Sequence, residues 1–119
     1  MPTEIRRIIF EDAEVIGAIR GLFDRLSITL PRGTIIGLSF VDEGGGRADL
    51  VIADDDGQRQ VLSVDREKLA AALILFCRSK KIPIPKDSTK IFKQLNGKLA
   101  LVVARNVPPA DLDRLSRET

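Results

Sequence analysis

Residues 34–64, TIIGLSFVDEGGGRADLVIADDDGQRQVLSV, contain three β-rich runs separated by breaks rich in Gly and Asp. The breaks at 42–46 and 55–57 favour turns, and Asp-Gly between such runs is a strong hairpin signal. Within 47–53, two sets of residues alternate with the period of a half-buried strand: Ala48, Leu50 and Ile52, and Arg47, Asp49 and Val51. We therefore predict an antiparallel meander over 34–41, 47–53 and 58–64.

One helix is expected before this meander in the sequence and a second helix after it. The first runs from an N-cap at Asp12 to about Ser27 and has a broad apolar stripe. Gly17 and Gly21 lie inside it, where they cost helix stability and would allow a strand or helix to approach closely. The second helix begins at the N-cap Asp65 and ends near residue 81. Its middle, residues 70–77, is apolar on every side, which favours either a central core element or a face covered by a partner.

The remaining strands lie near the two ends of the chain. Residues 4–10, rich in isoleucine, predict a first strand. Residues 89–95 and 98–104 flank Asn96-Gly97, the preferred type I′ turn pair, and predict a terminal hairpin. The alternative is a short helix over 88–95 with Asn96-Gly97 as its C-cap. No internal repeat is evident.

The expected order is β-α-β-β-β-α-β-β, an α+β fold. Short connections favour a mainly antiparallel sheet of five to six strands, with two main helices packed on one face. Residues 1–106 are predicted to form a single domain. Residues 107–119 are predicted to form a charged C-terminal tail, either a frayed helix or disordered.

Composition limits the possible functions. Of 119 residues, 44% are hydrophobic and 30% are charged, as in globular proteins. The chain has no histidine, which excludes Ser-His-Asp and Cys-His devices and zinc sites that use His. Cys77 is the single cysteine, so no intramolecular disulfide forms and a cytoplasmic location is expected. The longest apolar run, 69–77, is too short to span a bilayer, so we expect no membrane association.

Local clusters give no catalytic residue, metal site or cofactor site. Asp54-Asp55-Asp56-Gly57 lacks the spacing of a calcium loop and is typical of a solvated hairpin turn. Gly44-Gly45-Gly46 precedes a strand, unlike the glycines of a P-loop. Cys77 is expected to be a buried, inert thiol on an apolar helix.

Charge is distributed unevenly, with a net −4 over residues 1–64 and +6 over 65–119. Within 78–98, basic residues oppose Asp87 alone. They are candidates for binding an anion or a partner: Arg78, Lys80, Lys81, Lys86, Lys90, Lys93 and Lys98. Such a run predicts an electropositive surface for phosphate, nucleic acid or an acidic protein. The alternative is a solvated rim in which lysines discourage edge-to-edge pairing of strands.

Three functions remain in competition. The leading hypothesis is a non-catalytic protein-interaction or regulatory module that acts as a homodimer or in a small complex. The alternative is a nucleic-acid-binding accessory protein that uses the Lys-rich segment 78–98. The second alternative is a His-independent enzyme built on Asp, Glu, Lys or Arg.

Overall fold

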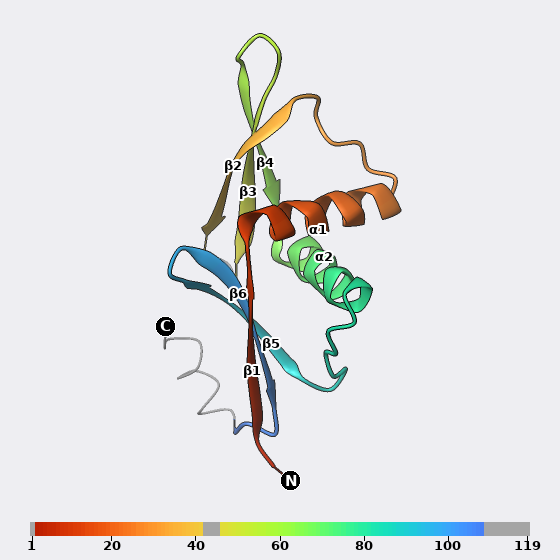
Figure 1. Ribbon diagram of the computed structural model, residues 1–119, viewed down its shortest axis with the longest axis vertical. Helices are drawn as coiled ribbons and strands as arrows, with labels where there is room; N and C mark the ends of the chain where they lie inside the picture. The colour runs from red at the N-terminus through yellow and green to blue at the C-terminus, as the bar shows by residue number, and fades with distance from the viewer. Residues whose placement is uncertain (1, 42–45, 109–119) are drawn as a thin grey trace.

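A computed structural model describes residues 2–41 and 46–108 of the chain, and its elements follow the expected order (Figure 1). Residues 89–95 form a strand, so the alternative helix over 88–95 is wrong. Asn96 (φ 51°) and Gly97 (φ 78°) make the tight turn of the last hairpin. The elements are β1 (Glu4–Phe10), α1 (Asp12–Arg25), β2 (Thr34–Val41), β3 (Arg47–Ala53), β4 (Arg59–Val64), α2 (Arg66–Ser79), β5 (Thr89–Leu95) and β6 (Lys98–Arg105).

The strands form two sheets, where one sheet of five to six strands was expected. Sheet A has the order β1-β6-β5 and sheet B the order β2-β3-β4, and every pairing is antiparallel. Helices α1 and α2 pack against each other beside the two sheets, α1 contacting β6 and α2 contacting β3 (Figure 1). The prediction of a single sheet was wrong. Strand β1 pairs with β6, which lies far from it in the sequence, and local sequence patterns do not show which distant strands pair.

One hydrophobic core joins the two sheets to the two helices. The inward side of β6 contributes Leu99, Leu101 and Val103, while β3 contributes Ala48 and Leu50. Both helices turn their buried stripes into this cluster: Val15, Ala18, Ile19, Leu22 and Phe23 from α1, and Leu69, Ala72, Leu73 and Cys77 from α2. The ring of Phe10 meets that of Phe76 edge to face, with centroids 5.9 Å apart.

Both helices begin at an acidic residue and end in the same motif. The N-cap of α1 is Glu11 rather than Asp12, and the Glu11 amide donates to Glu14 Oε1 over 2.9 Å. The N-cap of α2 is Asp65, as predicted. Its Oδ1 accepts from the Lys68 amide over 2.9 Å, which lowers the pKa of Asp65. Each helix then closes with a left-handed residue, Ser27 or Lys81.

The helices and their flanking strands reveal an internal duplication. The N-caps Glu11 and Asp65 lie 54 positions apart. The same spacing relates buried pairs and helix ends: Val15 and Leu69, Ala18 and Ala72, Ile19 and Leu73, Phe23 and Cys77, Ser27 and Lys81. The chain therefore consists of two β-α-β-β units, β1-α1-β2-β3 followed by β4-α2-β5-β6.

The two units exchange their first strands. Strand β1 of the first unit completes the sheet of β5 and β6, while β4 of the second unit completes the sheet of β2 and β3. The registers correspond, since Phe10 is paired with Leu99 as Val64 is paired with Ala48. Most positions in one sheet therefore have a counterpart in the other, with exceptions such as Ile36 at the irregularity in β2 and the pair Glu4 and Arg105.

Two sequence predictions fall wholly or partly outside the described residues. The predicted tail over 107–119 lies outside them apart from Val107 and Pro108, and so do Gly44 and Gly45 of the glycine run. Among the helices described, none is long and apolar enough to cross a membrane.

Candidate functional site

The seven basic residues singled out in the sequence do not share one surface. Arg78, Lys80 and Lys81 are exposed at the end of α2, where Lys80 Nζ lies 5.8 Å from the centre of the Phe76 ring. Lys86 is exposed on the connection between α2 and β5.

The other three lysines lie along the last hairpin and differ in their surroundings. Lys90 and Lys93 are an odd number of positions apart on β5, so their side chains lie on opposite faces of sheet A. Lys90 Nζ donates to the carbonyl of Ser88 over 3.1 Å, whereas Lys93 is 6% exposed and is not without an interaction partner. Lys98 Nζ lies 2.7 Å from Glu11 Oε1, and this carboxylate raises the pKa of Lys98.

The remaining sequence candidates have structural roles. Asp54 Oδ1 accepts from the amides of Asp56 and Gln58, over 3.0 and 2.9 Å, and so organises the hairpin turn. Cys77 is fully buried, as expected, and burial raises the pKa of its thiol.

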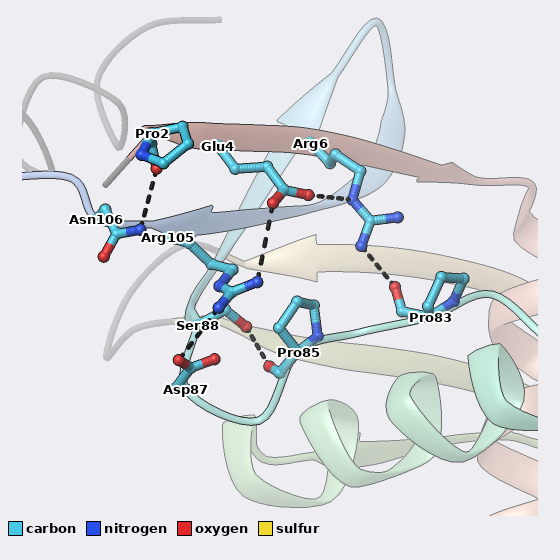
Figure 2. A network of polar contacts seen from close by, with 9 residues as sticks. All are labelled: Pro2, Glu4, Arg6, Pro83, Pro85, Asp87, Ser88, Arg105 and Asn106. Atoms are coloured by element: carbon cyan, nitrogen blue, oxygen red, sulfur yellow. Dashed lines mark hydrogen bonds and ion pairs between the residues drawn. The ribbon is translucent and has the colours of Figure 1, made fainter.

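A polar network attaches the connection before β5 to the end of sheet A (Figure 2). Arg6 on β1 donates from Nη2 to the carbonyl of Pro83 over 2.7 Å. Arg105 on β6 lies 3.4 Å from Asp87 and 4.0 Å from Glu4. These ion pairs are partly exposed, and exposed pairs contribute little stability. Because each charged group in the network already faces an opposite charge or a carbonyl, we assign it a positioning role.

A groove between α1 and α2 is the feature that the sequence reasoning misjudged. It has a volume of 170 Å³. A Cβ added at Gly17 or Gly21 would meet no atom within 4 Å. The two glycines therefore open a groove and do not serve the close approach that was expected of them. The groove is lined by Gly17, Ala18, Gly21, Leu22, Arg25, Ala72, Leu75, Phe76 and Ser79.

The duplication identifies the residue that makes the two sides of this groove unequal. Gly21 corresponds to Leu75, 54 positions later, and both line the groove. One side of the groove is thus filled by a leucine, while the other is left open by a glycine. The signal was present in the sequence as two glycines four positions apart in a helix, but their effect depends on how the second helix packs.

Apolar and charged groups surround the groove. Beyond Gly21 on α1 lies a second hollow of 730 Å³, also lined by Phe23, Asp24 and Ile28. Leu26 and Ile28 are 51% and 40% exposed where the chain leaves α1. Arg25 forms no hydrogen bond or ion pair with any residue that the structure describes. Together with Lys80, it gives the groove a positive end.

The groove is lined mainly by small and apolar residues. Arg25 is its one charged lining residue, and the hydroxyl of Ser79 already donates to the carbonyl of Phe76 over 2.7 Å. General acid–base chemistry needs converging ionisable groups, which this groove does not supply. Its volume of 170 Å³ is below the roughly 300–1,000 Å³ of small-molecule sites, whereas the adjoining hollow of 730 Å³ lies within that range. Residues 2–41 and 46–108 contain no cluster of acidic or cysteine side chains that would hold a metal.

No family model, curated protein or solved structure matches the chain.

Proposed function

We propose that the protein is a non-catalytic protein-interaction module that binds an amphipathic, acidic segment of a partner protein between α1 and α2. The observation that carries this proposal is the groove left open by Gly17 and Gly21 beside exposed Leu26 and Ile28. Exposed apolar groups next to a preformed groove are typical of surfaces that dock another chain.

Apolar contact supplies the affinity in this proposal. Full burial of a leucine or isoleucine side chain contributes about 1.5–3 kcal/mol, and Leu26 and Ile28 are each about half exposed. A partner that covers them while inserting one side chain beside Gly21 gains several such contributions. Ordering of the two chains offsets part of this gain.

Charge selects the partner. Arg25 and Lys80 flank one end of the groove, and Arg78 is exposed on the last turn of α2. Carboxylates on the bound segment complement these groups, and such complementarity raises the association rate and rejects basic segments. The affinity of the complex therefore falls as the salt concentration rises.

The test is an NMR titration of the full chain with three helix-forming peptides of equal length. One peptide combines a leucine stripe with glutamates, the second has the same stripe with lysines, and the third keeps the glutamates but replaces the leucines with alanine. We expect the first alone to shift the amide signals of Gly17, Gly21 and Leu75. The variant Gly21→Leu, which copies Leu75 onto α1, should weaken that binding about tenfold or more.

The control is Ala13→Leu, which adds the same side chain at an exposed position of α1 outside the groove. This variant should bind the acidic peptide as the parent does. If no peptide binds, or if Gly21→Leu and Ala13→Leu bind equally, the proposal fails. Preferential binding of DNA or RNA oligonucleotides, lost when Lys80, Lys81 and Lys86 are replaced, would instead favour the nucleic-acid function.

A further inference from the structure

A hollow of 280 Å³ lies at the end of sheet B where β3 turns into β4. Gly33 brings the preceding Arg32 to this place. It has a φ of 134° and packs so closely on the carbonyl of Ala53 that a Cβ would clash there. The hollow shares no lining residue with the groove between α1 and α2. It is lined by Arg32, Ile52, Asp54, Gln58, Arg59 and Gln60.

The polar network of Figure 2 occupies the corresponding end of sheet A. Arg32 lies two positions before Thr34, as Asp87 lies two positions before Thr89, and each threonine is paired with an alanine of the central strand. Counting along the other strands from their registers gives the remaining correspondences: Glu4 with Gln58, Arg6 with Gln60, and Arg105 with Asp54. The hollow therefore lies where sheet A has its network.

Sheet A closes this end with its own side chains. Arg105 lies 3.4 Å from the carboxylate of Asp87, and Arg6 donates to the carbonyl of Pro83 over 2.7 Å. These contacts attach the connection before β5 to the sheet (Figure 2).

Sheet B has the reverse charges at the two main places, but they do not pair. Asp54 Oδ1 accepts from the amides of Asp56 and Gln58, over 3.0 and 2.9 Å, and so holds the turn. Among the residues that the structure describes, the side chains of Arg32 and Arg59 have no hydrogen bond or ion pair. Two guanidinium groups thus line a hollow without a carboxylate bound to them.

These groups define a small ligand that carries both charges. Guanidinium groups match a carboxylate in a planar, two-point geometry, as Asp87 does for Arg105 in sheet A. Asp54 Oδ2 has no hydrogen bond within the described part of the chain and is an acceptor for an ammonium group. The consecutive carboxylates of residues 54–56 disfavour a dianion such as phosphate, and nucleic acid likewise. A volume of 280 Å³ is close to the lower end of the roughly 300–1,000 Å³ of small-molecule sites.

We infer that this hollow binds a free α-amino acid, with its carboxylate between Arg32 and Arg59 and its ammonium group facing Asp54. The carboxylate takes the place that Asp87 has in the network of sheet A. The site is independent of the proposed partner groove, so the two are tested separately.

The test is an NMR titration of the full chain with each of the common amino acids, and with acetate and inorganic phosphate as simple anions. We expect at least one amino acid to shift the amide signals of Arg32, Asp54 and Arg59 at about 10 mM, because two charge-assisted contacts support roughly millimolar affinity. Derivatives of that amino acid with the carboxylate amidated or the amine acetylated should bind about tenfold or more weakly.

Variants assign the two charges of the ligand. Arg32→Gln and Arg59→Gln should each weaken binding about tenfold or more. The control Arg66→Gln, at an exposed arginine outside the hollow, should leave binding unchanged. Asp54→Asn keeps the oxygen that holds the turn but removes the charge, so it should weaken binding of the amino acid and strengthen binding of acetate.

Three results would each overturn the inference. The first is that no amino acid shifts these signals. The second is that acetate or phosphate binds the parent as tightly as the best amino acid does, or that Asp54→Asn strengthens binding of both. The third is that Arg66→Gln weakens binding as much as Arg32→Gln does.

Discussion

Replacing Gly17 and Gly21 by alanine is expected to stabilise the protein, and the size of the effect follows from the groove. Both residues are exposed in the interior of α1, and a Cβ at either would meet no atom within 4 Å. Neither has a positive φ. The substitutions therefore gain the helix propensity of alanine, about 1 kcal/mol each, without a steric cost. The free energy of unfolding of the double variant should rise by about 2 kcal/mol, because the two added methyl groups do not occupy the same space.

The assay is thermal unfolding followed by circular dichroism, with urea unfolding as a second measurement. For a chain of 119 residues, the average unfolding entropy per residue converts 1 kcal/mol into about 4 °C. The double variant should therefore melt about 8 °C higher than the parent.

Gly33→Ala is a control variant that is expected to destabilise the protein. Gly33 has a φ of 134°, and a Cβ there would clash with the backbone carbonyl of Ala53. This variant should lose about 1 kcal/mol or more. Destabilisation by Gly17→Ala and Gly21→Ala would refute the reasoning, because it would mean that the helices meet closely at the two glycines and leave no groove.

Three further expectations concern the core and the titrating groups. Leu73→Ala, in the fully buried stripe of α2, should lower the free energy of unfolding by about 2–5 kcal/mol, while Leu26→Ala at a 51% exposed position should change it by less than about 0.5 kcal/mol; equal losses in urea unfolding would contradict the burial pattern. Burial raises the pKa of Cys77 above its ordinary 9.0, so the thiol deprotonates first in the unfolded chain, and stability should fall as the pH rises above about 9. Urea unfolding between pH 8 and 10 should show a steeper fall for the parent than for Cys77→Ala. Glu11→Gln should return the pKa of Lys98 toward 10.5, as followed by NMR of the lysine side chain, and an unchanged pKa would argue against the ion pair.

Local sequence patterns predicted the elements well and the sheet arrangement poorly. Asn96-Gly97 identified the last hairpin because the turn geometry is determined by the two residues themselves. Asp65 likewise identified the start of α2 through a contact with an amide three positions away. The pairing of β1 with β6 depends instead on packing between distant segments, so one sheet was expected where two exist.

The duplication was hidden because its two halves preserve the positions of the buried residues but not their identities. Val15 corresponds to Leu69 and Phe23 to Cys77, exchanges that keep apolar character while removing residue-level similarity. On the surface the side-chain type also differs, because Gly21 corresponds to Leu75. The common spacing of the helix N-caps was the available signal. It became informative only once the strand registers were known.

The exchange of first strands also determines when the protein can fold during its synthesis. Sheet B can assemble once β4 has left the ribosome, since β2, β3 and β4 are consecutive in the chain. Strand β1 is made before the other described strands, yet it must wait for β6, Lys98–Arg105, which is made after all of them. During that interval the apolar β1 strand has no partner, and unpaired apolar strands are the usual starting points of aggregation. A nascent chain stalled before residue 98 thus exposes a strand edge that the finished protein covers, and this intermediate is the one that a chaperone would need to protect.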